Sequence, residues 1–295
     1  MERKTWAAFV AAGSLLIAPM APSLANAPEG HEAKAVSNAV IAGQNADLTK
    51  AALAASSGPQ APRDISNPKG NNRIVFSAAP SRAVMNLCNI HFHAAAEHKG
   101  GDYTTYLGNG DGRGHGTGFV YNGHLSAAEL KPVAEAIGKT DHGELVPGNT
   151  IEIHFVHSTA HVKPGPTLAS CLSKENSNPQ LRVEAVVAVL VNDRKAADFT
   201  RMANLAVVNG YNAAPNIPDN LGKPVLYSGS TTGPNYNSVP SPLQVTWSVR
   251  PKVVKVDILT VGKWLQANPF KEDHAHGVRN LVIDPALLSP IQAAR

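Results

Sequence analysis

The sequence alternates short apolar runs of β-strand character with segments rich in glycine and proline, and this pattern most constrains the fold. The clearest run is 150–157, TIEIHFVH, in which Ile151, Ile153 and Phe155 recur at every second position. A period of two places these side chains on one face of a strand. Glycine and proline supply 24 and 22 of the 295 residues and separate the runs. A strand-dominated fold with many loops is therefore expected, and a helical bundle is not.

Further strands and a few helices are expected along the chain. The additional strands are predicted at 86–93, 182–191, 243–249 and 253–259. The run 182–191 is continuously apolar, which is typical of a buried strand. Short helices are predicted at 126–137 and 193–205, and 31–55 is either a helix or a loose arm. The expected fold is mostly β, of the α+β type, with a central, largely antiparallel sheet, peripheral helices and long loop insertions.

The first 27 residues have the organisation of a secretory signal peptide. Arg3 and Lys4 form a basic start, 7–18 is apolar, and cleavage is expected after Ala25 or Ala27. The apolar stretch is too short for a membrane anchor, because a bilayer core needs about 20 residues. We therefore expect a secreted or periplasmic protein with no membrane span. Its mature chain would have a helical or flexible arm at 28–57 and one domain at 58–295.

Cys88 and Cys171 are the two cysteines of the chain. In an oxidising compartment such a pair is expected to form a disulfide, which over a loop of this length stabilises by roughly 4 kcal/mol. Two buried free thiols are the alternative. A zinc site built on this pair is disfavoured, because the chain has no C-x-x-C spacing.

Charge and motif spacing argue against several common functions. The formal net charge is +4 and no basic run occurs, so nucleic-acid binding is not expected. The segment 108–118, GNGDGRGHGTG, fits neither the G-x-G-x-x-G motif nor a phosphate loop. Asp111 alone cannot supply the six to eight oxygens that calcium takes. A mobile loop is the expected state of this segment.

Three of the twelve histidines occupy positions suited to a metal. His91 and His93 lie two apart on one predicted strand and so share a face, and His154 lies on another. If the strands pair, three imidazoles converge, which is the ligand set of a catalytic zinc with one open position. Such a metal lowers the pKa of water from about 16 to about 7. An H-x-H pair also occurs in purely structural roles, so spacing alone leaves both interpretations open.

Four segments, in chain order, resemble the secreted bacterial alpha-type carbonic anhydrases. The matches are 89–98 with H-x-H-x-x-x-E-H, 152–157 with E-x-H-x-V-H, 227–234 with Y-x-G-S-x-T-T-P, and 245–247 with V-T-W. The gap between His93 and His154 is longer than in ordinary alpha enzymes. This gap, the segment 58–65 and the surroundings of the two cysteines are more similar to the delta-type branch. The resemblance covers about residues 56–290 and implies a sheet of the alpha-type carbonic anhydrase kind.

The resemblance implies a catalytic role for each matching residue. His91, His93 and His154 would bind zinc. Glu97 and Thr231 would form a gatekeeping pair, in which the threonine accepts a hydrogen bond from zinc-bound hydroxide and donates to the glutamate. This arrangement orients the hydroxide toward carbon dioxide.

Further roles follow from the same matches. Thr232 would hydrogen-bond bicarbonate. Asn89 and Glu152 would accept from the free ring nitrogens of His91 and His154. The implied walls of the substrate pocket are Val156, Val186 and Trp247. His98 and His157 match structural positions, and the candidate proton shuttles are His115, His124 and His161.

The function implied by the resemblance is a zinc lyase that interconverts carbon dioxide and bicarbonate. Simple anions and sulfonamides would inhibit it. A non-catalytic binding module on the same scaffold is the alternative, but such relatives typically lose a ligand histidine. A metal-dependent esterase would use the same site and has no motif of its own here.

Overall fold

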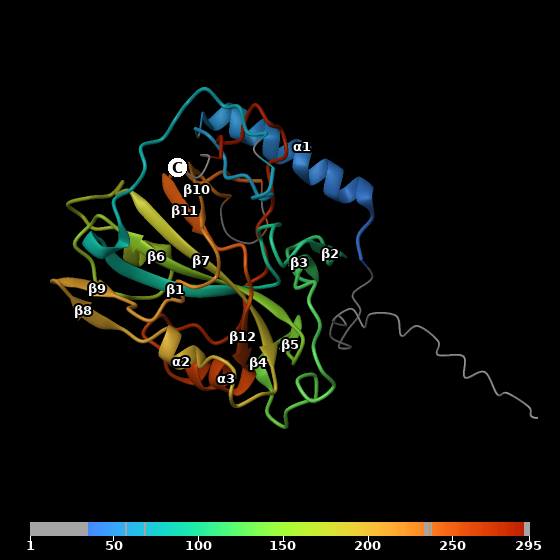
Figure 1. Ribbon diagram of the computed structural model, residues 1–295. Coiled ribbons are helices and arrows are strands. Elements are labelled where there is room, and N and C mark those ends of the chain that lie inside the picture. The colour runs from blue at the N-terminus through green and yellow to red at the C-terminus, as the bar shows by residue number, and fades with distance from the viewer. Residues whose placement is uncertain (1–34, 57, 68, 233–235, 237, 292–295) are drawn as a thin grey trace, which may run out of the picture.

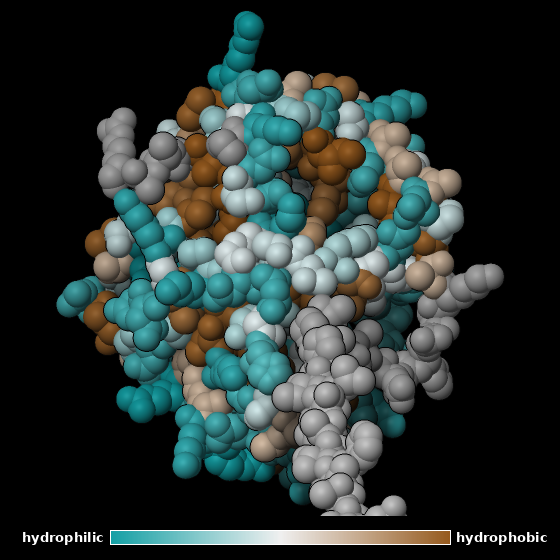
Figure 2. All heavy atoms as spheres, turned by 45° about the vertical axis from the view of Figure 1, so that its right-hand side comes forward, coloured by the Kyte–Doolittle hydropathy of each residue, from teal (hydrophilic) through white to brown (hydrophobic). Residues whose placement is uncertain are grey.

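The computed structural model of the chain describes residues 35–56, 58–67, 69–232, 236 and 238–291. The expected signal peptide at 1–27 lies outside these residues, as do Gly233 and Pro234 of the segment 227–234. None of the helices in the described part of the chain is long and apolar enough to cross a membrane. On the face shown in Figure 2, hydrophobic side chains lie in separate patches among hydrophilic ones, which is ordinary for a protein surface.

A six-stranded mixed sheet forms the centre of the molecule (Figure 1). Its strands are β1 (Asn86–Ala94), β6 (Thr150–Ser158), β7 (Leu181–Val191), β11 (Val245–Val249), β10 (Val225–Gly229) and β12 (Val254–Asp257). The pairs β1–β6, β6–β7 and β10–β11 are antiparallel. β11 and β12 both pair in parallel with β7, along successive parts of its length. The prediction of a mostly β fold with a largely antiparallel central sheet is confirmed.

Short two-stranded hairpins form outside this sheet. They are built from β2 (Thr105–Asn109) with β3 (Thr117–Val120), β4 (Ile137–Thr140) with β5 (Gly143–Leu145), and β8 (Ala206–Val208) with β9 (Tyr211–Ala213). The glycine-dense segment 108–118 connects β2 to β3. It is held in place by hydrogen bonds such as Val278 N to Gly114 O, 2.9 Å, which differs from the mobile loop we expected. Gly114 has φ 105°, and a Cβ there would lie 2.4 Å from the carbonyl oxygen of Val278, so glycine is required.

The helices agree with the sequence only in part. They are α1 (Asn38–Ala55), α2 (Phe199–Met202) and α3 (Ile258–Gln266), with the 3₁₀ turns η1 (Arg82–Val84) and η2 (Leu168–Cys171). Of the expected 31–55, residues 38–55 form the helix α1, which packs Leu48 and Ala52 against Val282 and Leu287.

One expected helix and one expected strand need correction. The helix expected at 126–137 is wrong, because only a turn forms after Ser126, Pro132 interrupts the segment and β4 begins at its end. The strand expected at 253–259 ends early. The Asp257 side chain accepts from Leu259 N at 3.2 Å, which caps α3 and turns the chain out of the sheet.

The sheet buries both of its faces, and they differ in chemistry. One face carries Ile151, Ile153 and Phe155, packed in a core with Phe199 of α2 and Trp264 of α3. The opposite face carries a second core that includes Val156, Val183 and Trp247. Glu152 and His154 share this second face, because they alternate with the apolar residues of β6. Strand β6 thus separates an apolar core from the face that holds the histidines.

Cys88 and Cys171 form a disulfide across 83 residues of sequence, as expected, and the alternative of two free thiols is excluded. The bond joins β1 to η2. Hydrogen bonds reinforce this connection, since Gly165 N donates to Cys88 O at 3.0 Å and Ser158 Oγ donates to Cys171 O at 2.6 Å. The segment before η2 is thereby fixed beside the strand that carries two of the histidines.

Replacement of both cysteines by serine should lower the free energy of unfolding by about 4 kcal/mol, because the bond closes a long loop in the unfolded chain. Urea denaturation of the oxidised protein and the Cys88→Ser/Cys171→Ser variant measures this difference. A reductant should destabilise the natural protein and leave the variant unchanged. Equal stability of the two oxidised proteins would contradict the prediction.

Candidate metal centre

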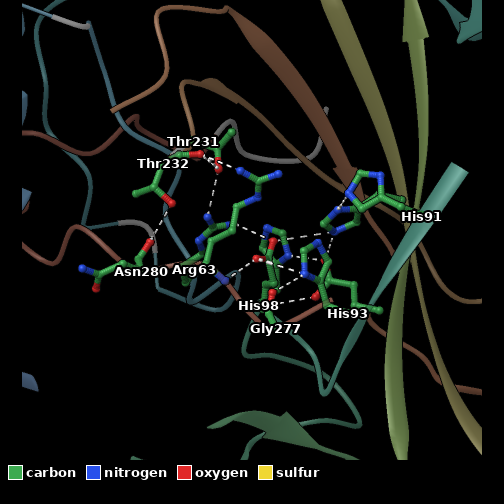
Figure 3. A network of polar contacts seen from close by, with 12 residues as sticks. Arg63, His91, His93, His98, Thr231, Thr232, Gly277 and Asn280 are labelled. Atoms are coloured by element: carbon green, nitrogen blue, oxygen red, sulfur yellow. Dashed lines mark hydrogen bonds and ion pairs between the residues drawn. The ribbon is translucent and has the colours of Figure 1, made fainter. Parts of the chain in front are cut away.

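The register of β1 and β6 brings the three candidate ligands together. His91 pairs directly with His154 across the two strands, and His93 lies on the same face of β1. The rings are close, with centroids 5.1 Å apart for His91 and His154 and 4.9 Å apart for His93 and His154. One ring nitrogen of each histidine lies within 4.8 Å of the other two (Figure 3).

Hydrogen bonds fix which nitrogen of each ring faces the centre. His91 Nδ1 donates to Asn89 Oδ1 at 2.6 Å, and His93 Nδ1 donates to Gly277 O at 2.8 Å. His154 Nε2 donates to Glu152 Oε1 at 2.9 Å. Carbonyl and carboxylate oxygens only accept, so the ring nitrogen at each contact carries the proton. The other nitrogen of each neutral ring then presents a lone pair to the centre.

The arrangement of these lone pairs fits a bound metal ion. His91 Nε2 and His154 Nδ1 lie 3.3 Å apart, although neither has a hydrogen to share with the other. Two nitrogens on a tetrahedral zinc are about 3.3 Å apart, given Zn–N bonds of about 2.0–2.1 Å. Within the described residues, the buried Nε2 of His93 has no hydrogen-bond partner. A cation at the centre accounts for both observations.

Burial favours the neutral form of His91 and His93. It lowers the pKa of His93 to about 3, although the Glu97 carboxylate acts in the opposite direction. Burial also lowers the pKa of His91 well below its usual value. Only the neutral ring offers a lone pair, so this environment favours metal binding.

Glu152 orients His154 through the ring nitrogen that faces away from the centre. It is fully buried and also accepts from His98 Nδ1 at 2.5 Å and His98 N at 3.0 Å. Burial alone would raise the pKa of Glu152, but His98 and His154 outweigh it and hold the pKa well below normal. His98 contacts the Tyr227 hydroxyl with its second nitrogen, so both of its ring nitrogens are engaged. This fits the structural position expected for His98.

Asn89 has a similarly fixed orientation. Its Nδ2 donates to Gly165 O at 3.1 Å, which turns its oxygen toward His91. Gly165 in turn donates to the carbonyl of Cys88. The disulfide-linked segment thus helps to set the orientation of a proposed ligand.

The residues expected as a gatekeeping pair lie near the histidines but do not touch each other. Glu97 Oε1 accepts from Arg279 N at 2.6 Å and lies 3.7 Å from His93 Nδ1. Thr231 Oγ1 instead accepts from Arg63 Nη2 at 3.3 Å. Among the described residues no hydrogen bond joins Thr231 to Glu97. Thr232 Oγ1 donates to Asn280 O at 3.2 Å.

Glu97 is held as a carboxylate. Burial alone would raise its pKa, but the neighbouring His93 ring and the Arg63 guanidinium lower it to about 2. The ionised group lies 3.9 Å from His154 Nε2, the ring nitrogen that faces away from the proposed metal position. A negative charge there offsets part of the charge that a divalent metal would bring.

A cleft of about 600 Å³ opens onto the histidines. Its lining includes His91, His93, Thr231 and Thr232, together with apolar Leu168 and Ala169. Of the expected proton shuttles, His115 lines the cleft, while His124 and His161 are exposed and do not.

Sequence reasoning missed several residues at this site. Arg113, His142, His276, Gly277 and Arg279 all line the cleft. They come from loops far from the motif strands, and no local pattern marks them. The signal that existed for His142 and His276 was only the high histidine content of the chain.

The expected pocket walls divide between the two faces of the sheet. Val156 and Trp247 lie on the histidine face, and the Trp247 ring is 5.1 Å from that of His154, but both are buried in the core of that face and neither lines the cleft. Val186 is wrong as a pocket residue. His154 pairs with Ala185, so Val186 points into the opposite core beside Ile153. Because β7 is apolar on both faces, its sequence does not reveal which residues face the site.

Comparison with known proteins gives one family. A family model described as Delta carbonic anhydrase matches residues 82–260. Among solved structures, a Photobacterium profundum alpha-carbonic anhydrase is similar at 17% identity, over 82% of this chain and 93% of that chain, with a TM-score of 0.28. A likeness at this level carries no weight, so the family assignment depends on the family model. No curated protein sequence matches the chain significantly.

Asn89→Ala should weaken zinc binding about 10–100-fold, because His91 loses the acceptor that fixes its tautomer and orientation. Zinc affinity is measured by competition with a chromophoric chelator. Asn86→Ala is the matched control, since Asn86 is also a buried amide on β1 but bonds to Ala160 O. Equal affinities of Asn89→Ala and the natural protein would show that Asn89 does not hold a ligand.

Proposed function

The chain belongs to the delta carbonic anhydrase family, and we propose that its activity, the reversible hydration of carbon dioxide, uses zinc held by His91, His93 and His154. The observation that carries the proposal is the convergence of three ring nitrogens whose opposite nitrogens are all tied to acceptors. Three neutral imidazoles are a ligand set that zinc accepts while keeping one position open. The non-catalytic alternative is disfavoured because no ligand histidine is missing.

The protein's own groups would prepare this centre for reaction. When bound, zinc supplies a Lewis acid that lowers the pKa of water to about 7 and makes hydroxide available at neutral pH. Asn89, Gly277 and Glu152 hold the three rings in fixed orientations, so little reorganisation is needed on binding.

The cleft suits a small uncharged substrate and an anionic product. Leu168 and Ala169 offer apolar wall to carbon dioxide, while Arg113 and Arg279 place positive charge near bicarbonate. Thr231 presents its hydroxyl to the cleft, and we assign it the orienting role, with Glu97 as the nearby carboxylate. Thr232 lines the same wall and is proposed to contact bicarbonate.

Turnover also requires export of a proton, for which His115 and His142 are placed at the cleft. Their rings stack at 3.7 Å between centroids, with planes 4° apart. Burial, and next the proximity of His142, lowers the pKa of His115. A histidine that titrates below neutral pH releases protons readily to solvent. We propose this pair as the proton relay.

Secretion or periplasmic export is part of the proposal. The Cys88–Cys171 disulfide supports it, because such bonds persist in oxidising compartments. The sequence of the first 27 residues points the same way.

Zinc-loaded protein should accelerate carbon dioxide hydration, and His154→Ala should lose both zinc and activity. A pH-indicator assay and metal analysis on the same sample measure the two properties, and simple anions or sulfonamides should inhibit the natural protein. His157→Gln is the control, because His157 is another buried histidine of β6 whose ring bonds to Phe155 O and not to the three candidate ligands. Zinc-loaded natural protein with no hydration above the buffer rate would refute the proposed function.

Thr231→Ala should retain zinc while kcat/KM falls about 100-fold, the usual cost of losing one hydrogen-bonding group at the reacting centre. Stopped-flow hydration and metal analysis separate the two effects. Thr49→Ala on α1, away from the cleft, should match the natural protein. A retained rate in Thr231→Ala would move the orienting role to Thr232.

A further inference from the structure

The hairpin of β8 and β9 leaves one edge strand uncovered. It lies at the margin of the molecule, with β8 on its outer side (Figure 1). The inner strand is fixed, because Asn212 N donates to Asn86 Oδ1 of β1 at 3.2 Å and Asn212 Nδ2 donates to Val162 O at 3.0 Å. Within the described part of the chain, no strand pairs with the other side of β8. This strand is therefore an open edge on a firmly held hairpin.

The turn of the hairpin shows where the free backbone groups of this edge point. Its two residues, 209–210, have φ of 51° and 83°, as in a type I′ turn. Such a turn makes Val208 and Tyr211 a hydrogen-bonded pair, so the next pair, Val207 with Asn212, is not hydrogen-bonded. The N–H and C=O of Val207 then point away from β9, just as the N–H of Asn212 points away from β8.

The side chains of β8 are apolar and exposed. Val207 is 72% exposed and Val208 is 40% exposed, and they point to opposite faces of the strand. Proteins commonly protect an edge strand with lysine, proline or a bulge. β8 has none of these, and its length of three residues limits how much surface a partner can bury.

We propose that β8 pairs with β8 of a second copy of the chain, antiparallel and about a twofold axis at Val207. The two Val207 residues would exchange both outward hydrogen bonds, N–H to C=O in each direction. In this register Ala206 lies opposite Val208 of the second copy, so a small side chain meets a larger one. The two hairpins would form one four-stranded sheet through an isologous contact.

Charge favours a second copy over an unrelated partner. A twofold axis at Val207 brings identical residues together, and like charges directly opposite one another are destabilising. Residues 202–218 contain no charged side chain, so this repulsion is absent. The same segment offers no charged group by which an acidic or basic partner would be recognised. Because stable interfaces bury at least about 1,200 Å² and β8 is short, we expect a weak dimer with a Kd of about 100 µM.

Analytical ultracentrifugation of the natural protein and of Val207→Pro tests this pairing. The natural protein should pass from monomer toward dimer between about 1 and 500 µM. Val207→Pro should associate at least about 10-fold more weakly, because it loses the N–H that each copy donates to the other. The hydrogen bonds between β8 and β9 do not use this N–H, so the hairpin should persist. Unchanged dimerisation of a folded Val207→Pro protein, checked by circular dichroism, would overturn the proposal.

Charge variants test the twofold axis itself, even if Val207→Pro fails to fold. Val207→Lys and Val207→Glu should each be monomeric, since each dimer would oppose two like charges. Mixing the two variants should restore association, because opposite charges then meet across the axis. Val75→Lys is the matched control, since Val75 is 71% exposed and lies outside the hairpin, and it should dimerise as the natural protein does. No restoration on mixing would overturn the pairing at Val207.

The proposal is independent of the metal and of the proposed function. Natural protein that stays monomeric at every concentration would overturn it, and would leave the edge to an extended peptide of another protein. Natural protein that dimerises through Val207 but does not hydrate carbon dioxide would instead refute the proposed function alone.

Discussion

The antiparallel register of β1 and β6 is the constraint on which the rest of the site depends. It sets His91 opposite His154 and leaves His93 on the same face. Because side chains alternate along a strand, a slip of β6 by one residue would turn His154 to the other face and separate it from His91 and His93. Such a slip is unfavourable, because it would bury the polar side chains of Glu152 and His154 in the apolar core formed by Ile153, Phe155 and the helices. The apolar core thus helps to specify the candidate metal site on the far side of the same strands.

The buried charges around the histidines form a balanced set. Glu152 pairs with His98 and His154, while Glu97 lies among Arg63, Arg279 and His93. Each carboxylate would be costly to bury alone, and each is compensated by cationic or donor groups from a different loop. This distribution explains why segments distant in sequence converge here. These segments supply the cationic and hydrogen-bond-donating groups that compensate the buried carboxylates of Glu97 and Glu152.

The sequence predicted the local features of the site well and its long-range features poorly. Strands β1, β6 and β7, the histidine triad and its partners Asn89 and Glu152 all follow from alternation and motif, and the cysteine pair from composition and compartment. Val186 was misplaced because a strand buried on both faces has no alternation to indicate direction. Arg63 and Arg279 were missed because their roles come from tertiary contacts that leave no local pattern. The helix expected at 126–137 failed where Pro132 overrode the apolar spacing.

The C-terminal segment shows how such tertiary contacts complete the centre. His276 pairs with β1 in an isolated bridge, with His276 N bonded to Phe92 O and Ala94 N to His276 O, at 2.9 and 2.8 Å. From this path Gly277 reaches His93, Arg279 N reaches Glu97, and Val278 binds Gly114 of the glycine-dense connection. The long insertion between β1 and β6 is therefore fastened to the same segment that orients a proposed ligand. The insertion also carries Arg113 and His115 to the wall of the cleft. Its glycines allow the insertion backbone to approach the C-terminal segment closely enough to build this wall.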